Sequence, residues 1–320
     1  MNYDVFNGDA DGICALLQLR LAEPLVDSKL ITGVKRDISL LKQVDVNVAD
    51  RVTVLDISLD KNREPLLNLL NNQVEVFYVD HHQPGDIPEH PKFKALIDTD
   101  ANVCTSLLVD HYLNHRFSAW AVTAAFGDNL EQSALQAAQA LNLSEEQLQQ
   151  LNQLGVCINY NAYGESIDDL HFAPDALFQL LLGYESPLDF ISDKAEVFQA
   201  LMSGYAADME RAFNVVPEYR TDKVAVFILP NEKWARRVSG VWSNELANLN
   251  PERAHAVLTV NKQGGYLISV RAPLNNKTGA DVLCGQFPSG GGRKAAAGIN
   301  HLPNEHLSIF IDEFEKNYRC

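Results

Sequence analysis

The first half of the chain alternates short apolar runs with stretches of helical periodicity, and this alternation limits the folds open to it. Apolar runs of four to eight residues rich in Val, Ile and Phe are typical of buried parallel strands. An amphipathic segment, REPLLNLLNN (63–72), separates two of them. A strand–helix–strand order predicts a parallel sheet with helices on both faces. The runs are YDVF (3–6), RVTVLDI (51–57), VEVFYVD (74–80) and FKALIDTD (93–100).

The pattern changes after residues 181–192, a stretch interrupted by Gly and Pro. Longer β-runs follow, and NKQGG (261–265) between two of them predicts a hairpin turn. The predicted fold class is therefore α/β. It has an N-terminal Rossmann-like parallel sheet with helices on both faces, in residues 1–185, and a smaller C-terminal α/β domain with a mixed sheet, in residues 200–320.

Length, charge and cysteine content restrict the class of protein. The 320 residues suggest two domains. A net charge of −16 argues against long duplex DNA as a partner, because duplex binding relies on broad phosphate neutralisation. No apolar run approaches the ~20 residues that span a bilayer, and the first residues lack a signal-peptide pattern. Five scattered cysteines suit a reducing compartment. We therefore expect a cytoplasmic protein without a membrane partner, and a homodimer remains open.

Acidic and histidine residues recur where the apolar segments of the first half end. Ligands of open parallel sheets bind beyond the carboxyl ends of the strands, so these side chains are expected to converge. Collected carboxylates repel one another unless they are protonated or bind a metal. Taken singly, each has a commoner explanation as a turn, a helix cap or a polar loop. The residues are Asp9, Asp11, Asp56, Asp80, His81, His82 and Asp128.

Taken together, these segments resemble a known family. GDADG (8–12), the Asp in VLDIS (54–58), DHH (80–82) and GDN (127–129) are similar to the four successive motifs of the DHH phosphoesterase superfamily. That superfamily includes RecJ-type exonucleases, nano-RNases and cyclic-dinucleotide phosphodiesterases. SGGGRKAAAG (289–298) is similar to the signature of the DHH-associated C-terminal domain, so the resemblance spans nearly the whole chain.

The resemblance implies a role for each matching residue. His82 would lie near the scissile phosphate, Asp80 would orient an imidazole, and Arg271 would contact substrate. In the C-terminal signature, Arg293 and Lys294 would bind the substrate together with Gly290, Gly291 and Gly292. The metal ligands would be Asp9, Asp11, Asp56, His81 and Asp128.

The glycines of that signature have a physical reason, because a backbone without Cβ can approach a phosphate closely. We expect KAAAG (294–298) to continue into a helix whose N-terminus favours the anion. Two positions depart from the family pattern. Val5 stands where many members have a histidine, which puts a second metal in doubt. Arg293 replaces the usual histidine and retains anion binding without proton chemistry.

The sequence therefore predicts a metal-dependent phosphoesterase that hydrolyses short oligonucleotides or small nucleotides by metal-activated water. Its cofactor would be one or two divalent ions, Mn²⁺ foremost and Mg²⁺ as the alternative. A cyclic-dinucleotide phosphodiesterase, a nucleotide 3′-phosphatase and a non-catalytic nucleotide-binding regulator remain open. Two polar stretches, GVKRD (33–37) and INYNAYG (158–164), could line a substrate cleft or form plain loops.

Overall fold

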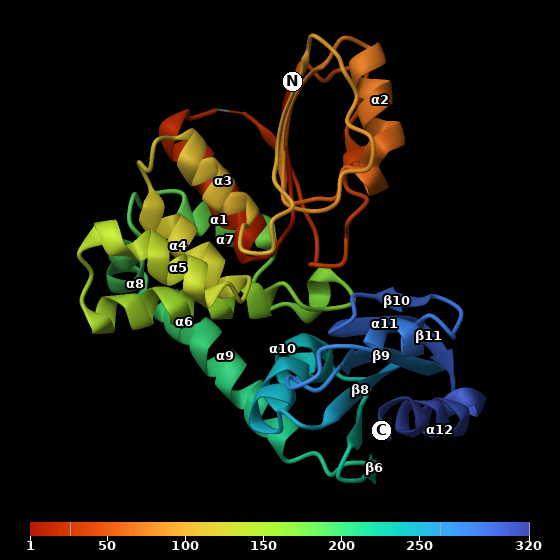
Figure 1. The fold of residues 1–320 in the computed structure, drawn as a ribbon. Coiled ribbons are helices and arrows are strands. Elements are labelled where there is room, and N and C mark those ends of the chain that lie inside the picture. The colour runs from red at the N-terminus through yellow and green to blue at the C-terminus, as the bar shows by residue number, and fades with distance from the viewer. Residues whose placement is uncertain (26, 263, 320) are drawn as a thin grey trace. The chain divides into compact units, whose positions relative to one another are not determined.

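The computed structural model describes residues 1–25, 27–262 and 264–319, which fall into two compact units (Figure 1). Unit 1 is Met1–Gly204 and unit 2 is Tyr205–Cys320. Helix α9 (Ala195–Phe213) contains the division, which lies beyond the Gly- and Pro-containing stretch at residues 181–192. That stretch itself includes a helix of unit 1, α8 (Pro187–Asp193).

Unit 1 is built on a five-stranded parallel sheet with the order β2-β1-β3-β4-β5. The chain moves from β1 outward to β2 and then returns to the other side of β1 to form β3. The order therefore reverses between β1 and β3, which is where ligands of open α/β sheets bind. The strands are β1 (Asn2–Phe6), β2 (Lys29–Ile31), β3 (Arg51–Leu55), β4 (Glu75–Asp80) and β5 (Phe93–Ile97).

Helices cover both faces of this sheet, as the sequence predicted. On one face, Leu66 and Leu69 of α2 (Arg63–Asn71) share a buried cluster with strand residues that include Val5. On the other face lie α1 (Ala10–Ala22) and α3 (Thr105–Tyr112) (Figure 1). There the buried Arg20 of α1 donates from Nε to Asp4 Oδ2 of β1 at 2.9 Å, which pairs a charge that burial would otherwise penalise.

The rest of unit 1 is helical, as its pattern predicted. Helix α4 is buried along nearly its whole length and packs against α1 and α6, which fixes the position of its C-terminal end relative to α1. Ser144 and Gln147 form a capping box at the start of α6. The helices are α4 (Ser118–Gly127), α5 (Glu131–Ala138), α6 (Glu145–Asn161) and α7 (Pro174–Leu181), with short 3₁₀ turns at Leu41–Gln43, Asp60–Asn62, Gln139–Leu141 and Ile167–Asp169.

Unit 2 contains a six-stranded mixed sheet with the order β10-β11-β9-β8-β7-β6. Strands β7 and β8 pair in parallel and the other pairs are antiparallel, which confirms the predicted mixed sheet. In the predicted turn between β8 and β9, Gln263 lies outside the described residues. The strands are β6 (Tyr219–Arg220), β7 (Val224–Leu229), β8 (Ala254–Asn261), β9 (Gly265–Arg271), β10 (Gly290–Gly292) and β11 (Ala296–Pro303).

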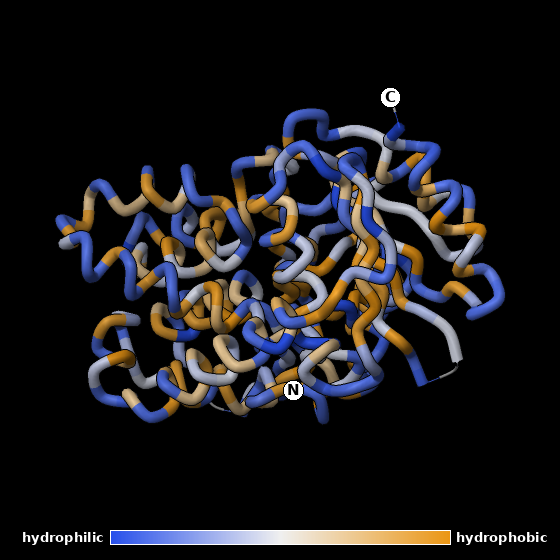
Figure 2. The backbone as a smooth tube through the Cα atoms, turned by 90° about the horizontal axis from the view of Figure 1, so that it is seen from below, coloured by the Kyte–Doolittle hydropathy of each residue, from blue (hydrophilic) through white to orange (hydrophobic). Residues whose placement is uncertain are grey.

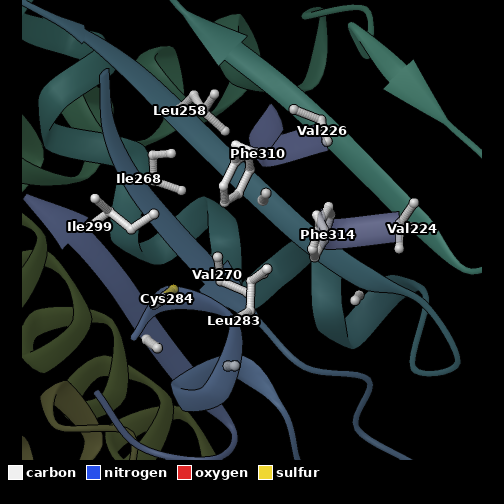
Figure 3. Packing of buried hydrophobic residues seen from close by; sticks show 14 of the residues in the cluster. Val224, Val226, Leu258, Ile268, Val270, Leu283, Cys284, Ile299, Phe310 and Phe314 are labelled. Carbon is white, nitrogen blue, oxygen red and sulfur yellow. The ribbon is translucent and has the colours of Figure 1, made fainter. Parts of the chain in front are cut away.

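The core of unit 2 lies between this sheet and two helices, α11 (Ala280–Cys284) and α12 (Leu307–Tyr318). Figure 3 shows Phe310 and Phe314 of α12 against the aliphatic side chains of the sheet. On the opposite face, Trp242 of α10 (Lys233–Leu249) packs on Phe227 with ring centroids 4.9 Å apart. Along several helices, hydrophobic and hydrophilic residues alternate, as expected for amphipathic helices (Figure 2).

The prediction that a helix begins at KAAAG is wrong. Residues 296–303 form strand β11, and a tight turn closed between Arg293 and Ala296 joins it to β10. Ala has a high helix propensity, but β11 pairs along β9 on one side and β10 on the other. This tertiary pairing outweighs the local preference.

No helix among the described residues is long and apolar enough to cross a membrane. Cys14, Cys104, Cys157 and Cys284 are buried free thiols, and Cys320 lies outside the described residues.

Candidate metal centre

The carboxyl ends of three neighbouring strands bring most of the predicted ligands together. Asp9 and Asp11 follow β1 at the start of α1, Asp56 follows β3, and Asp80 ends β4. Because the strands are parallel, these ends meet at one edge of the sheet. Asp128 reaches the same place as the C-cap of α4. We call these five carboxylates the acidic edge.

Two overlapping sets of potential metal donors occur at this edge. In each set, one ligand atom per residue lies within 4.8 Å of the others. His81 belongs to both sets, so its ring stands at their centre. One set is Asp56, His81 and His82, and the other is Asp11, His81 and Asp128.

The hydrogen bonding of His81 leaves one ring nitrogen suited to a metal. Its Nδ1 lies 2.8 Å from the carbonyl oxygen of Val103. A carbonyl only accepts, so Nδ1 carries a proton, and in the neutral ring Nε2 then has the lone pair. That Nε2 lies 3.4 Å from Asp56 Oδ1 and 3.9 Å from Asp128 Oδ2. A histidine anchored through its other nitrogen in this way is typical of metal ligands.

The second histidine is held differently. His82 Nδ1 lies 2.7 Å from Oδ1 of the fully buried Asp80, while its side chain is 45% exposed. Burial lowers the pKa of His82, but the hydrogen bond and charge of Asp80 outweigh this and the pKa is raised. Among the described residues, nothing hydrogen-bonds to Asp80 Oδ2. Asp80 therefore orients His82 and adds negative charge behind it.

Asp56 sits in an unfavourable backbone conformation and an unfavourable electric field. Its φ of 57° places a non-glycine residue in the left-handed region, which costs of order 1 kcal/mol. Its carboxyl is buried, and both burial and the charges of Asp9, Asp11 and Asp128 raise its pKa well above the usual value. Strain and repulsion at one residue are typical of sites kept for function.

Asp11 connects the acidic edge to α3. Its two carboxylate oxygens accept the backbone amides of Thr105 and Ser106, each at 2.7 Å. The carboxylate thus caps the first turn of α3 from a distant part of the chain. Each oxygen retains a further lone pair, so this carboxylate is rigidly placed and still able to bind a cation.

Asp9 is engaged by groups of the chain itself. Its Oδ1 accepts the amides of Asp11 at 3.0 Å and Gly12 at 3.1 Å, while Oδ2 contacts the ammonium of Lys35. Burial favours the neutral form of Asp9, but Lys35 and the Gly12 amide hold its pKa below the usual value. Lys35 also bonds to Asn159 Oδ1 at 2.9 Å. The sequence pointed to the stretches that contain Lys35 and Asn159 but gave neither residue a role.

The donor set fits a divalent cation. The two sets provide carboxylate oxygens from Asp11, Asp56 and Asp128 and imidazole nitrogens from His81 and His82. This combination is suited to Mn²⁺, Fe²⁺ or Zn²⁺ and compatible with Mg²⁺. The raised pKa values of Asp56 and Asp128 reflect buried charge that the neighbouring side chains do not balance. A bound cation would relieve this repulsion.

Apart from Arg271 at the end of β9, the predicted substrate residues of unit 2 lie on one hairpin, residues 290–298, which we call the glycine hairpin. Arg271 is paired in register with Ala296, the residue that closes the turn with Arg293. A Cβ on Gly290 would lie 1.9 Å from the Cys284 carbonyl oxygen, and Gly292 has a φ of 145°. Gly291 has neither a steric clash nor a positive φ that would require glycine, since a Cβ there would have nothing within 4 Å.

The side chains around the hairpin are cationic. Arg293 and Lys294 are exposed, and Arg271 donates from Nε to Asn244 Oδ1 at 2.7 Å. The register of β9 and β11 places Arg271 beside the turn that carries Arg293. Arg271 and Arg293 therefore belong to the same end of the unit 2 sheet.

A scan against protein-family models and a search of curated proteins found no match. A manganese-bound exonuclease RecJ aligns with a TM-score of 0.62 and 18% identity, over 98% of this chain and 89% of that one. The chain has the RecJ fold. RecJ of Thermus thermophilus in complex with Mn²⁺ aligns with a TM-score of 0.68 and 18% identity.

The extent of the match differs among these structures. The alignment covers 98% of this chain but 51% of the Thermus RecJ chain. This chain also aligns with PggH from Vibrio cholerae, described as a pGpG-specific phosphodiesterase, with a TM-score of 0.54 and 11% identity, over 98% of this chain and 99% of PggH. The two-domain architecture expected from the DHH resemblance is thus confirmed at the level of the fold.

Proposed function

We propose that this chain belongs to the DHH phosphoesterase superfamily and hydrolyses phosphodiester bonds of short oligonucleotides or small nucleotides with a divalent metal ion. The observation that carries the proposal is the orientation of His81. Its Nδ1 is held by the Val103 carbonyl, and its Nε2 lies 3.4 Å from Asp56 Oδ1 and 3.9 Å from Asp128 Oδ2 at the ligand-binding edge of the sheet. The shared fold with RecJ and PggH supports the same conclusion.

The metal would be held by Asp11, Asp56, His81 and Asp128. A divalent ion there would act as a Lewis acid on the phosphate and lower the pKa of water. We propose Mn²⁺ because the donors mix imidazole with carboxylate, and because the two RecJ structures above contain manganese. Mg²⁺ is the alternative to be tested alongside it.

The protein's own contribution to hydrolysis is orientation and proton transfer. The oxygen of water joins phosphorus, the ester P–O bond breaks, and the departing oxygen needs a proton. His82 is placed to supply it from Nε2, because Asp80 holds the ring through Nδ1 while the rest of the side chain is partly exposed. Substrate phosphate would bind to the glycine hairpin, where Arg293 offers a paired donor geometry that suits phosphate oxygens.

A short substrate agrees with two properties of the chain. Its net charge of −16 disfavours a long nucleic-acid footprint, whereas a local cluster of Arg271, Arg293 and Lys294 suffices for one or two phosphates. PggH, whose length the alignment covers almost entirely, is described as specific for the dinucleotide pGpG. We therefore place linear dinucleotides first among the candidate substrates.

The test is a substrate panel of linear dinucleotides, longer oligonucleotides, cyclic dinucleotides and a nucleoside 3′-phosphate, each with Mn²⁺ and with Mg²⁺. We expect hydrolysis of linear dinucleotides, and a loss of more than ~100-fold for His81→Ala, since even outer-shell changes at metal sites reach that range. His111→Ala, an exposed histidine of α3, is the matched control. Failure of the metal-loaded protein to cleave any member of the panel would contradict the proposal, as would full activity of His81→Ala.

A further inference from the structure

The side chain of Lys35 places an ammonium group among the carboxylates of the acidic edge. It follows β2, whose carboxyl end lies beside that of β1. Its ammonium contacts Asp9 Oδ2, lies 2.9 Å from Asn159 Oδ1, and is 3.5 Å from Asp128 Oδ1. The three oxygens come from α1, α6 and the end of α4. An ammonium group has three N–H donors, so one cation here meets three oxygen partners.

The backbone around Lys35 is fixed, so this placement belongs to the fold. The Lys35 amide donates to the Ala162 carbonyl at 2.9 Å, beside the end of α6. Asn7 Nδ2 donates to the Lys35 carbonyl at 3.4 Å. A Cβ on Gly8 would lie 2.0 Å from the Gly33 carbonyl oxygen, so this close approach of the loop requires glycine at position 8.

The carboxylate of Asp128 lies between Lys35 and His81. Its Oδ1 faces Lys35 at 3.5 Å, whereas its Oδ2 lies 3.9 Å from His81 Nε2. The two oxygens of one carboxylate therefore serve two different partners.

The oxygens around Lys35 are already occupied by its ammonium. Both groups of potential metal donors in the described part of the chain include His81, and neither includes Asp9. Val5 of β1 is fully buried among the apolar residues that face α2, so its position contributes only to the core. Asp9 and Asn159 both bond to the lysine. A metal ion at this position would have to displace a charge-paired ammonium.

We propose that the Lys35 ammonium takes the place of a second metal ion between Asp9, Asn159 and Asp128, so that the centre binds a single divalent ion at the His81 side. This inference rests on the metal centre of the proposed function. Lys35 then supplies a positive charge that contacts Asp9 Oδ2 and lies 3.5 Å from Asp128 Oδ1. The bound ion is left to Asp11, Asp56, His81 and the remaining oxygen of Asp128.

The experiment measures bound Mn²⁺ per chain by equilibrium dialysis, together with the electron paramagnetic resonance spectrum of the loaded protein. The native chain is expected to bind about one ion with the signal of isolated Mn²⁺. Lys35→Met keeps the length of the side chain but removes its charge. It should raise the stoichiometry to about two, with the spectrum of a coupled pair ~3.5–4 Å apart. Lys35→Arg should remain at about one.

Lys92→Met is the matched control, because it removes the same charge next to β5 at the opposite edge of the unit 1 sheet. It should leave the stoichiometry at that of the native chain. Two coupled ions in the native chain would overturn the proposal for Lys35, even if the enzyme hydrolyses dinucleotides. One isolated ion without hydrolysis of any substrate would support Lys35 and count against the proposed function, so the two failures are distinguishable.

Discussion

The acidic edge of unit 1 and the glycine hairpin of unit 2 carry opposite charges and hold them in opposite ways. At the acidic edge, Asp9, Asp11 and Asp56 are each almost fully buried, and Asp56 has a strained backbone. On the hairpin, Arg293 and Lys294 are exposed, and the apolar core lies behind the sheet (Figure 3). The buried charges of Asp56 and Asp128 cost stability until a cation binds, whereas the exposed charges of the hairpin cost little.

The largest effect is expected from changing the most strained residue of the acidic edge. Asp56→Asn removes a metal ligand and should lower kcat/KM by more than ~100-fold. Asn tolerates a positive φ and carries no charge, so the metal-free protein should unfold with an unchanged or higher free energy, by about 1 kcal/mol. Urea unfolding in a chelator measures this. A clear loss of stability would show that Asp56 is structural.

The second effect concerns a buried ionisable group of unit 2. His255 of β8 is 1% exposed, and burial, assisted by Arg253, lowers its pKa from 6.5 to about 4. Between these values the unfolded chain binds the proton more readily, so unit 2 loses stability as the pH falls from 6.5 to 4, by up to roughly 3 kcal/mol. The loss is complete near the folded pKa.

His255→Gln should remove this part of the pH dependence. Its unfolding free energy should change less than that of the native chain between pH 6.5 and 4, as followed by the exchange of unit 2 amides. Equal slopes for the two proteins would mean that His255 is protonated in the folded state.

The smallest effect is expected on the hairpin. Arg293→Gln removes an exposed, charged donor and should raise KM about tenfold with little change in kcat, in the range of one charge-assisted hydrogen bond. Its thermal stability should equal that of the native chain, because the side chain is exposed. Lys316→Gln on α12 is the control for loss of an exposed charge in unit 2. A large fall in kcat with unchanged KM would contradict a binding role.

The sheet of unit 1 and the position of its site were predictable because both follow from local patterns. Short apolar runs separated by helices define parallel strands, and parallel strands bring Asp56 and His81 to one edge. The role of Lys35 was not predictable in this way. It depends on how closely the loop after β2 approaches Gly8 and the end of α6, and no periodicity encodes that approach.

On the glycine hairpin, the local sequence pattern predicted the wrong secondary structure. KAAAG has the composition of a helix, and its local preference was overruled by pairing with β9 and β10, which lie on either side. The glycines were expected to allow a close approach of a ligand, and the structure adds a close approach of the neighbouring chain. Cys284 lies against Gly290 and Ala297 against Gly292, which leaves Gly291 as the glycine of the hairpin without an internal steric reason.

If the acidic edge is a metal centre, Mn²⁺ must stabilise the folded chain, and a titration of folding stability with Mn²⁺ measures this directly. Binding to the folded state alone adds about 2.7 kcal/mol at a free Mn²⁺ concentration of about 100 times Kd. We expect this gain for the native chain, with slower hydrogen exchange concentrated in the amides around Asp56 and His81, and its loss in Asp56→Asn. An equal gain in both proteins, or no gain in either, would contradict a metal centre at the acidic edge.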